Sequence, residues 1–185
     1  WLPESAAQDC IQTSIDWVYF EKVSIQKERL LQQASDHFIQ QQAHLKPAFQ
    51  DFLQQEKYWV DDAALFYVIG QAHDNIPWWK WPEDIRTCTT KALTQWRREY
   101  ADQILAFKVV QFFFQYQWHA LKSYCEVYDI EVIGDLPIYV DHNSVDVWTN
   151  QHLFQLSDEG LLLAVSGVPP DAFNETGQLW GNPLY

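Results

Sequence analysis

Apolar positions first follow a regular pattern from Phe20 onward. From Val23 to Phe38 apolar side chains recur at steps of three and four residues, with Gln and Glu between them. This spacing predicts an amphipathic helix. The preceding residues, 1 to about 20, show no such period, and we expect an irregular segment there.

Two further helices are indicated by their first residues. Pro47 suits the first turn of a helix, where its missing N–H is not needed. Asp61 or Asp62 suits the N-cap of the next helix. The segment "NIPWWKWPED", Asn75 to Asp84, then interrupts the helical pattern with two prolines. Its three Trp indicate either a platform for a sugar or a packed corner between helices.

The longest helical pattern runs from about Thr90 to Tyr128, and a break is expected near Ala101. Its second half, "ILAFKVVQFFFQYQWHALKSYC", is apolar on several sides. We therefore expect that half to be broadly buried.

The period then changes to that of a strand. Ile130 to Gly134 is short and rich in β-branched residues, which predicts a buried strand that ends at Asp135. A long helix followed by such a strand is typical of a parallel α/β fold, in which strand carboxyl ends carry the chemistry. Asp135 is therefore a candidate functional acid, although an Asp before Pro137 can also serve as a turn residue.

The last third has few regular signals. Asn143 to Trp148 predicts one helical turn, and "LFQLSDEGLLLAVSG" predicts a hairpin with Asp158-Glu159-Gly160 as its turn. The closing loop, "GVPPDAFNETGQLWGNPLY", is aromatic and rich in amides. It predicts either a rigid packed loop or a clamp for a neutral polyhydroxylated ligand. In the second case the rings would be Phe173 and Trp180, and the hydrogen-bonding groups would be Asp171, Asn174, Gln178 and Asn182.

Charge and composition exclude several functions. The net charge of −13 disfavours nucleic acid and anionic lipid as partners, and no apolar run approaches the ~20 residues that a membrane span needs. Three distant Cys fit a reducing compartment, and no metal-ligand spacing, phosphate-binding Gly loop or nucleophile elbow is present. The chain starts at Trp1, contains no Met and ends within the aromatic loop, so we expect it to be a piece of a longer protein.

Several motifs together resemble one family. "YWVDDAALF", "PWWKWPE", "GDLPIYV", "VDVW" and "VSGVPPDAFNETGQLWGNPLY" occur in this order, and the last is long and specific. The chain resembles the 4-α-glucanotransferases, or amylomaltases, of glycoside hydrolase family 77, over essentially its whole length.

The resemblance implies an α/β fold, a partial (β/α)₈ TIM barrel with a large α-helical insertion subdomain. Residues 1–185 would be part of one catalytic domain. Within it, about 20–100 would be the insertion, about 101–140 a barrel helix and strand, and 141–185 an active-site loop region. The implied location is the cytoplasm, or the plastid stroma in a plant.

The implied reaction is retaining transfer of an α-1,4-glucan segment to the 4-hydroxyl of glucose or another maltodextrin, without metal or organic cofactor. The nucleophilic Asp, the acid/base Glu and a third acid are expected after Tyr185, so no catalytic residue is assigned in this chain. The resemblance implies substrate-binding roles for Asp135, Phe173, Gln178, Trp180 and Asn182.

Two departures from the family motif concern the loop. Ala172 stands where some members carry Tyr, which puts one outer glucan contact in doubt, and Asn174 stands where Ser is common.

Three other interpretations stay open: an α-glucan hydrolase on the same barrel, a non-catalytic glucan-binding protein, and a self-contained helical domain. The oligomeric state is not predicted.

Overall fold

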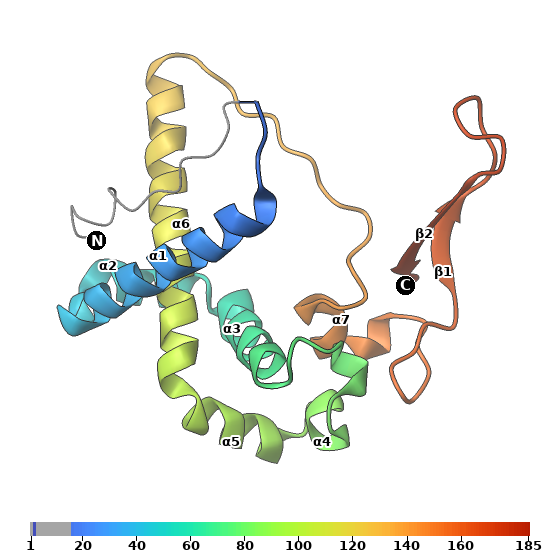
Figure 1. The fold of residues 1–185 in the computed structure, drawn as a ribbon, viewed down its shortest axis with the longest axis horizontal. Helices are drawn as coiled ribbons and strands as arrows, with labels where there is room; N and C mark the ends of the chain where they lie inside the picture. The colour runs from blue at the N-terminus through green and yellow to red at the C-terminus, as the bar shows by residue number, and fades with distance from the viewer. Residues whose placement is uncertain (1, 3–15) are drawn as a thin grey trace. The chain divides into compact units, whose positions relative to one another are not determined.

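The computed structural model describes residue 2 and residues 16–185. Figure 1 shows helices along most of this part of the chain and one small antiparallel sheet near its end. The helices are α1 (Phe20–Gln40), α2 (Pro47–Gln55), α3 (Lys57–Ala72), α4 (Glu83–Arg86), α5 (Thr90–Glu99), α6 (Ala101–Val127) and α7 (Val145–Thr149). Short 3₁₀ turns are η2 (Ala43–Leu45), η3 (Trp78–Lys80) and η4 (Gln151–Leu153), and the strands are β1 (Val165–Val168) and β2 (Gln178–Pro183).

Most of the expected helices are confirmed. The pattern after Phe20 forms α1, Pro47 is the first residue of α2, and Asn143 to Trp148 contains most of α7. The long pattern divides at Tyr100 into α5 and α6, as the expected break near Ala101 predicts. The irregular start lies mostly outside the described residues.

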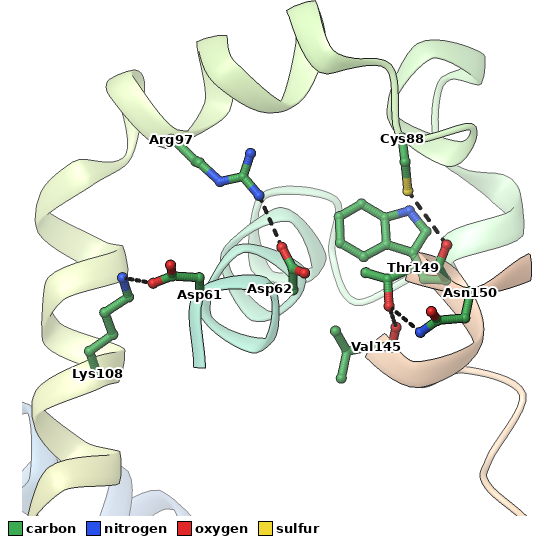
Figure 2. A network of polar contacts seen from close by, with 9 residues as sticks. Asp61, Asp62, Cys88, Arg97, Lys108, Val145, Thr149 and Asn150 are labelled. Carbon is green, nitrogen blue, oxygen red and sulfur yellow. Dashed lines mark hydrogen bonds and ion pairs between the residues drawn. The ribbon is translucent and has the colours of Figure 1, made fainter. Parts of the chain in front are cut away.

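The capping role expected of Asp61 or Asp62 is wrong, because α3 begins at Lys57 and both residues lie inside it. Each pairs with a cation instead. Lys108 Nζ donates to the Asp61 carboxylate, and Arg97 Nη2 donates to Asp62 Oδ1 over 3.0 Å (Figure 2). Both pairs are partly open to solvent and contribute at most about 1 kcal/mol each.

The chain divides into two compact units. The first contains residues up to Asp61 together with Asp102–Glu131. Its core is a set of Phe rings from α1, α2 and α6, whose ring centroids lie 5.3 Å apart for Phe38–Phe113 and for Phe49–Phe112. Edge-on packing of this kind contributes about 0.5–1.5 kcal/mol per pair beyond the burial of area.

The C-terminal half of α6 corrects one expectation. Val109, Phe112 and Phe113 are buried, but the following turns expose Phe114, Tyr116, Trp118, Leu121, Tyr124 and Val127. The broad burial predicted for Ile104–Cys125 therefore agrees with the structure up to Phe113. It is wrong for the turns after Phe113, because no element of the described residues covers those side chains.

The second unit contains Asp62–Ala101 and Val132–Tyr185. Its core includes Trp78, Trp81 and Trp148, and each indole N–H donates to a backbone carbonyl, of His142, Ile76 and Ile85 respectively, over 2.7–3.1 Å. Burial of indole is favourable only when its N–H is paired in this way. The segment "NIPWWKWPED" is thus a packed corner rather than an exposed sugar platform.

The strand predicted at Ile130–Gly134 is absent, and the described residues form no barrel. The segment is extended and exposed, with Ile133 93% exposed. A parallel strand needs neighbouring strands to pair its N–H and C=O groups, and the described residues provide none beside it. This part of the α/β expectation is corrected.

The expected hairpin is confirmed only at its turn. Ser157 N donates to Leu161 O and Leu156 bridges Leu162, so Asp158-Glu159-Gly160 is a tight turn. The strand that follows, β1, pairs instead with β2, antiparallel, with Val168 opposite Gln178 and an irregularity between Val165 and Gly167. The closing loop is therefore itself a hairpin, and its tip is the loop that connects β1 to β2 (Figure 1).

Candidate functional site

Strand β2 carries three of the five residues predicted to bind substrate. Gln178 and Trp180 are two positions apart and therefore share one face of the strand. Trp180 Nε1 donates to Gln178 Oε1 over 3.0 Å. This bond occupies the amide oxygen and leaves the amide nitrogen of Gln178, an exposed residue, as a donor for a ligand. The indole is 48% exposed, so β2 offers a ring and an amide side by side.

Asn182, the third of these residues, has a structural contact. Its Nδ2 donates to Val140 O over 2.9 Å, and Tyr185 Oη donates to Ile138 O over 2.8 Å. These two bonds hold residues 138–140 beside the end of the hairpin. The backbone three to five residues after Asp135 is therefore attached to the strand that carries Trp180.

A row of four rings continues from Trp180. The centroid of the Trp180 ring lies 6.0 Å from that of Tyr139 in an edge-on arrangement. Tyr139 in turn stacks on Tyr185, with centroids 6.3 Å apart. Phe154 lies 5.2 Å beyond Tyr185. Sequence reasoning missed Tyr139, Tyr185 and Phe154 as site residues. One sequence signal could have indicated Tyr139, namely an aromatic residue four positions after the candidate acid, Asp135.

The hairpin tip presents Phe173, which is 97% exposed. Asp171 Oδ1 accepts the backbone N–H groups of Phe173 and Asn174, each over 2.8 Å, and Asn174 Oδ1 accepts the N–H of Thr176 over 3.0 Å. Asp171 and Asn174, considered as ligand partners from the sequence, thus use these oxygens to build the turn that holds Phe173 outward.

Gly177 is required at the base of the tip. Its φ is +73°, and an added Cβ would lie 2.5 Å from Val168 O. Any other residue would strain the backbone and move the strands apart. The tip therefore has a defined shape even though its ring is open to solvent.

Asp135 is exposed and makes no hydrogen bond or ion pair with the described residues. It lies on the extended segment that ends at the attached residues 138–140. Among the described residues, no side-chain hydrogen bond or ring contact joins Asp135 or Phe173 to Trp180. The structure thus brings Gln178, Trp180 and Asn182 together and leaves the other two predicted residues on adjacent segments.

The loop before the hairpin, residues 141–164, is fixed to the Trp corner, the packed segment Asn75–Asp84. The His142 ring stacks on Trp79 with centroids 3.9 Å apart, and His142 Nε2 donates to Gly160 O over 2.9 Å. Burial is the main cause that lowers the pKa of His142, while the Gly160 carbonyl and the Asp141 carboxylate act in the opposite direction. His142 is therefore favoured as the neutral imidazole.

A second attachment joins this loop to α4 and the turn after it. Arg86 Nη1 donates to Asp158 O over 2.6 Å. Cys88 Sγ donates to Trp148 O over 3.5 Å (Figure 2). Burial, together with the nearby Asp62 carboxylate, raises the pKa of Cys88 to about 11. Cys88 is therefore a packed thiol rather than a nucleophile.

The described residues contain neither a cluster of metal ligands nor a membrane-spanning helix. No group of three His, Cys, Asp or Glu side chains that could hold a metal ion occurs among residue 2 and residues 16–185. Within the same residues, no helix combines the length and the apolarity that crossing a membrane requires.

Comparison with known proteins identifies the family. The sequence model described as 4-alpha-glucanotransferase matches residues 3–185. A chloroplastic/amyloplastic 4-alpha-glucanotransferase of Oryza sativa subsp. japonica is 38% identical over 173 residues, which are 92% of this chain and 29% of that protein. A 4-alpha-glucanotransferase of Thermus thermophilus is 42% identical over 140 residues, 76% of this chain and 28% of that protein.

The fold is similar to that of a solved relative. An amylomaltase from Streptococcus agalactiae in complex with acarbose superposes with a TM-score of 0.91 at 34% identity, covering 100% of this chain and 37% of that one. The described fold is thus a part of the amylomaltase fold, and the chain spans about 30% of the length of the curated relatives compared. The chain therefore belongs to the 4-alpha-glucanotransferases, glycoside hydrolase family 77.

Proposed function

We propose that the whole protein transfers α-1,4-glucan segments, with retention, from one maltodextrin to the 4-hydroxyl of glucose or of another maltodextrin. The observation that carries this is the paired Gln178 amide and half-exposed Trp180 ring on β2, attached to the segment that follows Asp135. A ring face beside a free amide donor suits the C–H faces and hydroxyls of a glucose unit. The relative that binds acarbose, an analogue of an α-glucan, supports this class of ligand.

The chemistry needs two carboxyl groups that we assign to the sequence after Tyr185. In a retaining mechanism one carboxylate attacks the anomeric carbon and forms a glycosyl ester, while a carboxylic acid protonates the departing glucan oxygen. The same group, now a carboxylate, takes the proton from the acceptor 4-hydroxyl, which displaces the ester. In this proposal the 185 residues contribute binding surfaces only, and no metal or organic cofactor takes part.

We assign the acceptor side of the site to the hairpin. The ester can be resolved by water or by a sugar hydroxyl, and transfer dominates when the hydroxyl is held in line. Positioning of this kind is equivalent to effective concentrations of ~10⁵ M or more. Trp180 would hold the acceptor ring, Gln178 would bind one of its hydroxyls, and Phe173 would cover the bound glucan. Asp135 would contact the sugar at the cleavage site.

The same proposal gives each segment a place in the whole protein. Residues about 20–100 form a helical insertion, about 101–140 a barrel helix and strand, and 141–185 an active-site loop region. The exposed rings on the second half of α6 and the extended segment around Ile133 support this, because apolar surface of that extent needs a cover. The proposed location is the cytoplasm, or the plastid stroma in a plant.

Product analysis with maltotriose tests the function. The whole protein should convert maltotriose into glucose and a ladder of longer glucans. Shortening alone would instead show an α-glucan hydrolase, and binding without any conversion would show a glucan-binding protein. The 185 residues alone should give no conversion, and turnover by them would contradict the assignment of the acids.

A further inference from the structure

Tyr139 follows the candidate acid, Asp135, by four positions in the chain, and its ring contacts that of the candidate acceptor residue, Trp180. Its ring meets that of Trp180 at an interplanar angle of 64°, which is an edge-on contact. On its other side it stacks on Tyr185 at 17°. Tyr139 is half-buried, whereas Trp180 is 48% exposed. The Tyr139 ring is therefore held from two sides. The Trp180 ring is held by Tyr139 on one side and is open to solvent.

The position of Tyr139 is fixed through the backbone on both sides of it. Tyr185 Oη binds Ile138 O and Asn182 Nδ2 binds Val140 O. Both donors come from the end of the hairpin. The Tyr139 side chain therefore keeps its place relative to β2 even though the segment from Ile130 to Pro137 is extended and exposed.

We propose that Tyr139 is a positioning residue for Trp180 and, through it, for the acceptor glucan. This inference rests on the proposed function. Without Tyr139, the indole would keep its bond to Gln178 but could rotate about its side-chain torsions into the space that the Tyr139 ring occupies. Gln178 would rotate with it, because the two side chains are bonded. Both groups assigned to the acceptor would then lose their alignment.

Loss of Tyr139 should change the use of the acceptor and not the cleavage of the donor. Donor cleavage uses the acids after Tyr185 and should be little affected. Acceptor use depends on the ring and the amide, so loss of Tyr139 should raise the acceptor KM and the ratio of hydrolysis to transfer. An edge-on ring pair of this kind accounts for a change of roughly two- to tenfold.

The test compares variants of the whole protein with maltotriose as donor and glucose as acceptor. Tyr139→Ala should raise the KM for glucose by roughly two- to tenfold. Tyr139→Phe keeps the ring and should stay within about twofold of the wild type. If Tyr139→Ala does not fold, as judged by circular dichroism, Tyr139→Leu keeps apolar bulk without a ring and should show the same rise.

A double-mutant cycle separates positioning from a general structural effect. If Tyr139 acts through Trp180, Tyr139→Ala made in a Trp180→Ala background should change the KM for glucose by less than about twofold. Equal effects in the two backgrounds would overturn the inference, and so would a Phe variant as impaired as the Ala variant. A wild-type protein that fails to transfer to glucose would overturn the proposed function, and this inference with it. If the wild type does transfer, additive effects of Tyr139→Ala and Trp180→Ala on the KM for glucose would overturn this inference alone.

Discussion

The Cα of Gly160 lies against the indole of Trp78. A Cβ added at Gly160 would be 2.6 Å from Cη2 of that ring, and the φ of Gly160 is +80°. Trp78 is fully buried and its N–H donates to His142 O. The turn predicted at Asp158-Glu159-Gly160 is therefore also a packing contact that holds the loop to the Trp corner.

Substitution of Gly160 should destabilise the protein more than substitution of a glycine with open space around it. Gly160→Ala combines a left-handed backbone strain of about 1–2 kcal/mol with overpacking of about 1–3 kcal/mol. Gly181 has a similar φ of +78° but nothing within 4 Å of an added Cβ, so Gly181→Ala should show the strain alone. Urea unfolding of both variants measures the difference; equal free energies of unfolding would show that Trp78 moves away without cost.

The lowered pKa of His142 predicts a pH dependence of stability. Because burial disfavours the imidazolium in the folded state, the unfolded state binds more protons below the ordinary His pKa of about 6.5. The contribution is therefore fully present above that pH and is lost as pH falls toward the lower folded-state pKa. His142→Gln should reduce the slope of unfolding free energy against pH in the range just below the ordinary His pKa of about 6.5. An unchanged slope would mean that the imidazole is already well solvated.

Cys88 should react slowly with alkylating reagents. A pKa of about 11, against 9.0 for an ordinary thiol, leaves about 100-fold less thiolate at pH 8. In a variant in which Cys88 is the only thiol, with Cys10 and Cys125 among the Cys replaced by Ser, iodoacetamide should label Cys88 at least ~100-fold faster after unfolding than before. Similar rates in the two states would contradict the burial of this thiol and its bond to Trp148 O.

The bond from Asn182 to Val140 O should control the order of the segment after Asp135. Asn182→Asp replaces the donor with an acceptor that repels the carbonyl, a loss of about 1 kcal/mol or more. Hydrogen exchange of a peptide that covers residues 136–141 should become faster. Asn150→Asp removes an equivalent bond, to Asp146 O in α7, and should leave that peptide unchanged. The same exchange in both variants would mean that the Tyr185 bond alone holds the segment.

The helical part of the fold could be predicted from the sequence because its signals are local. The three- and four-residue spacing after Phe20, and Pro47 at a first turn, are properties of neighbouring residues. Burial of the second half of α6 and pairing at Ile130–Gly134 depend on distant partners, which these residues do not meet in the described structure. A pattern of apolar residues indicates a tendency to be covered but not what covers it.

The candidate site could be predicted in part for the same reason. The aromatic and amide composition indicated Gln178 and Trp180, which the structure joins by a hydrogen bond. It did not indicate that Asp171 and Asn174 build the hairpin tip, since a side chain that bonds its own backbone has the same sequence signature as a ligand group. Tyr139 was missed because its contact with Trp180 spans 41 positions along the chain.

The ratio of hydrolysis to transfer in a Trp180 variant tests most directly the central claim, that β2 binds the acceptor. In the whole protein acting on maltotriose, Trp180→Ala should raise the ratio of released reducing ends to transferred glucan several-fold. An exposed Trp outside the hairpin, Trp17, provides the matched control, and Trp17→Ala should leave that ratio unchanged. An unchanged ratio together with an unchanged KM for glucose in Trp180→Ala would contradict the assignment of β2 to the acceptor.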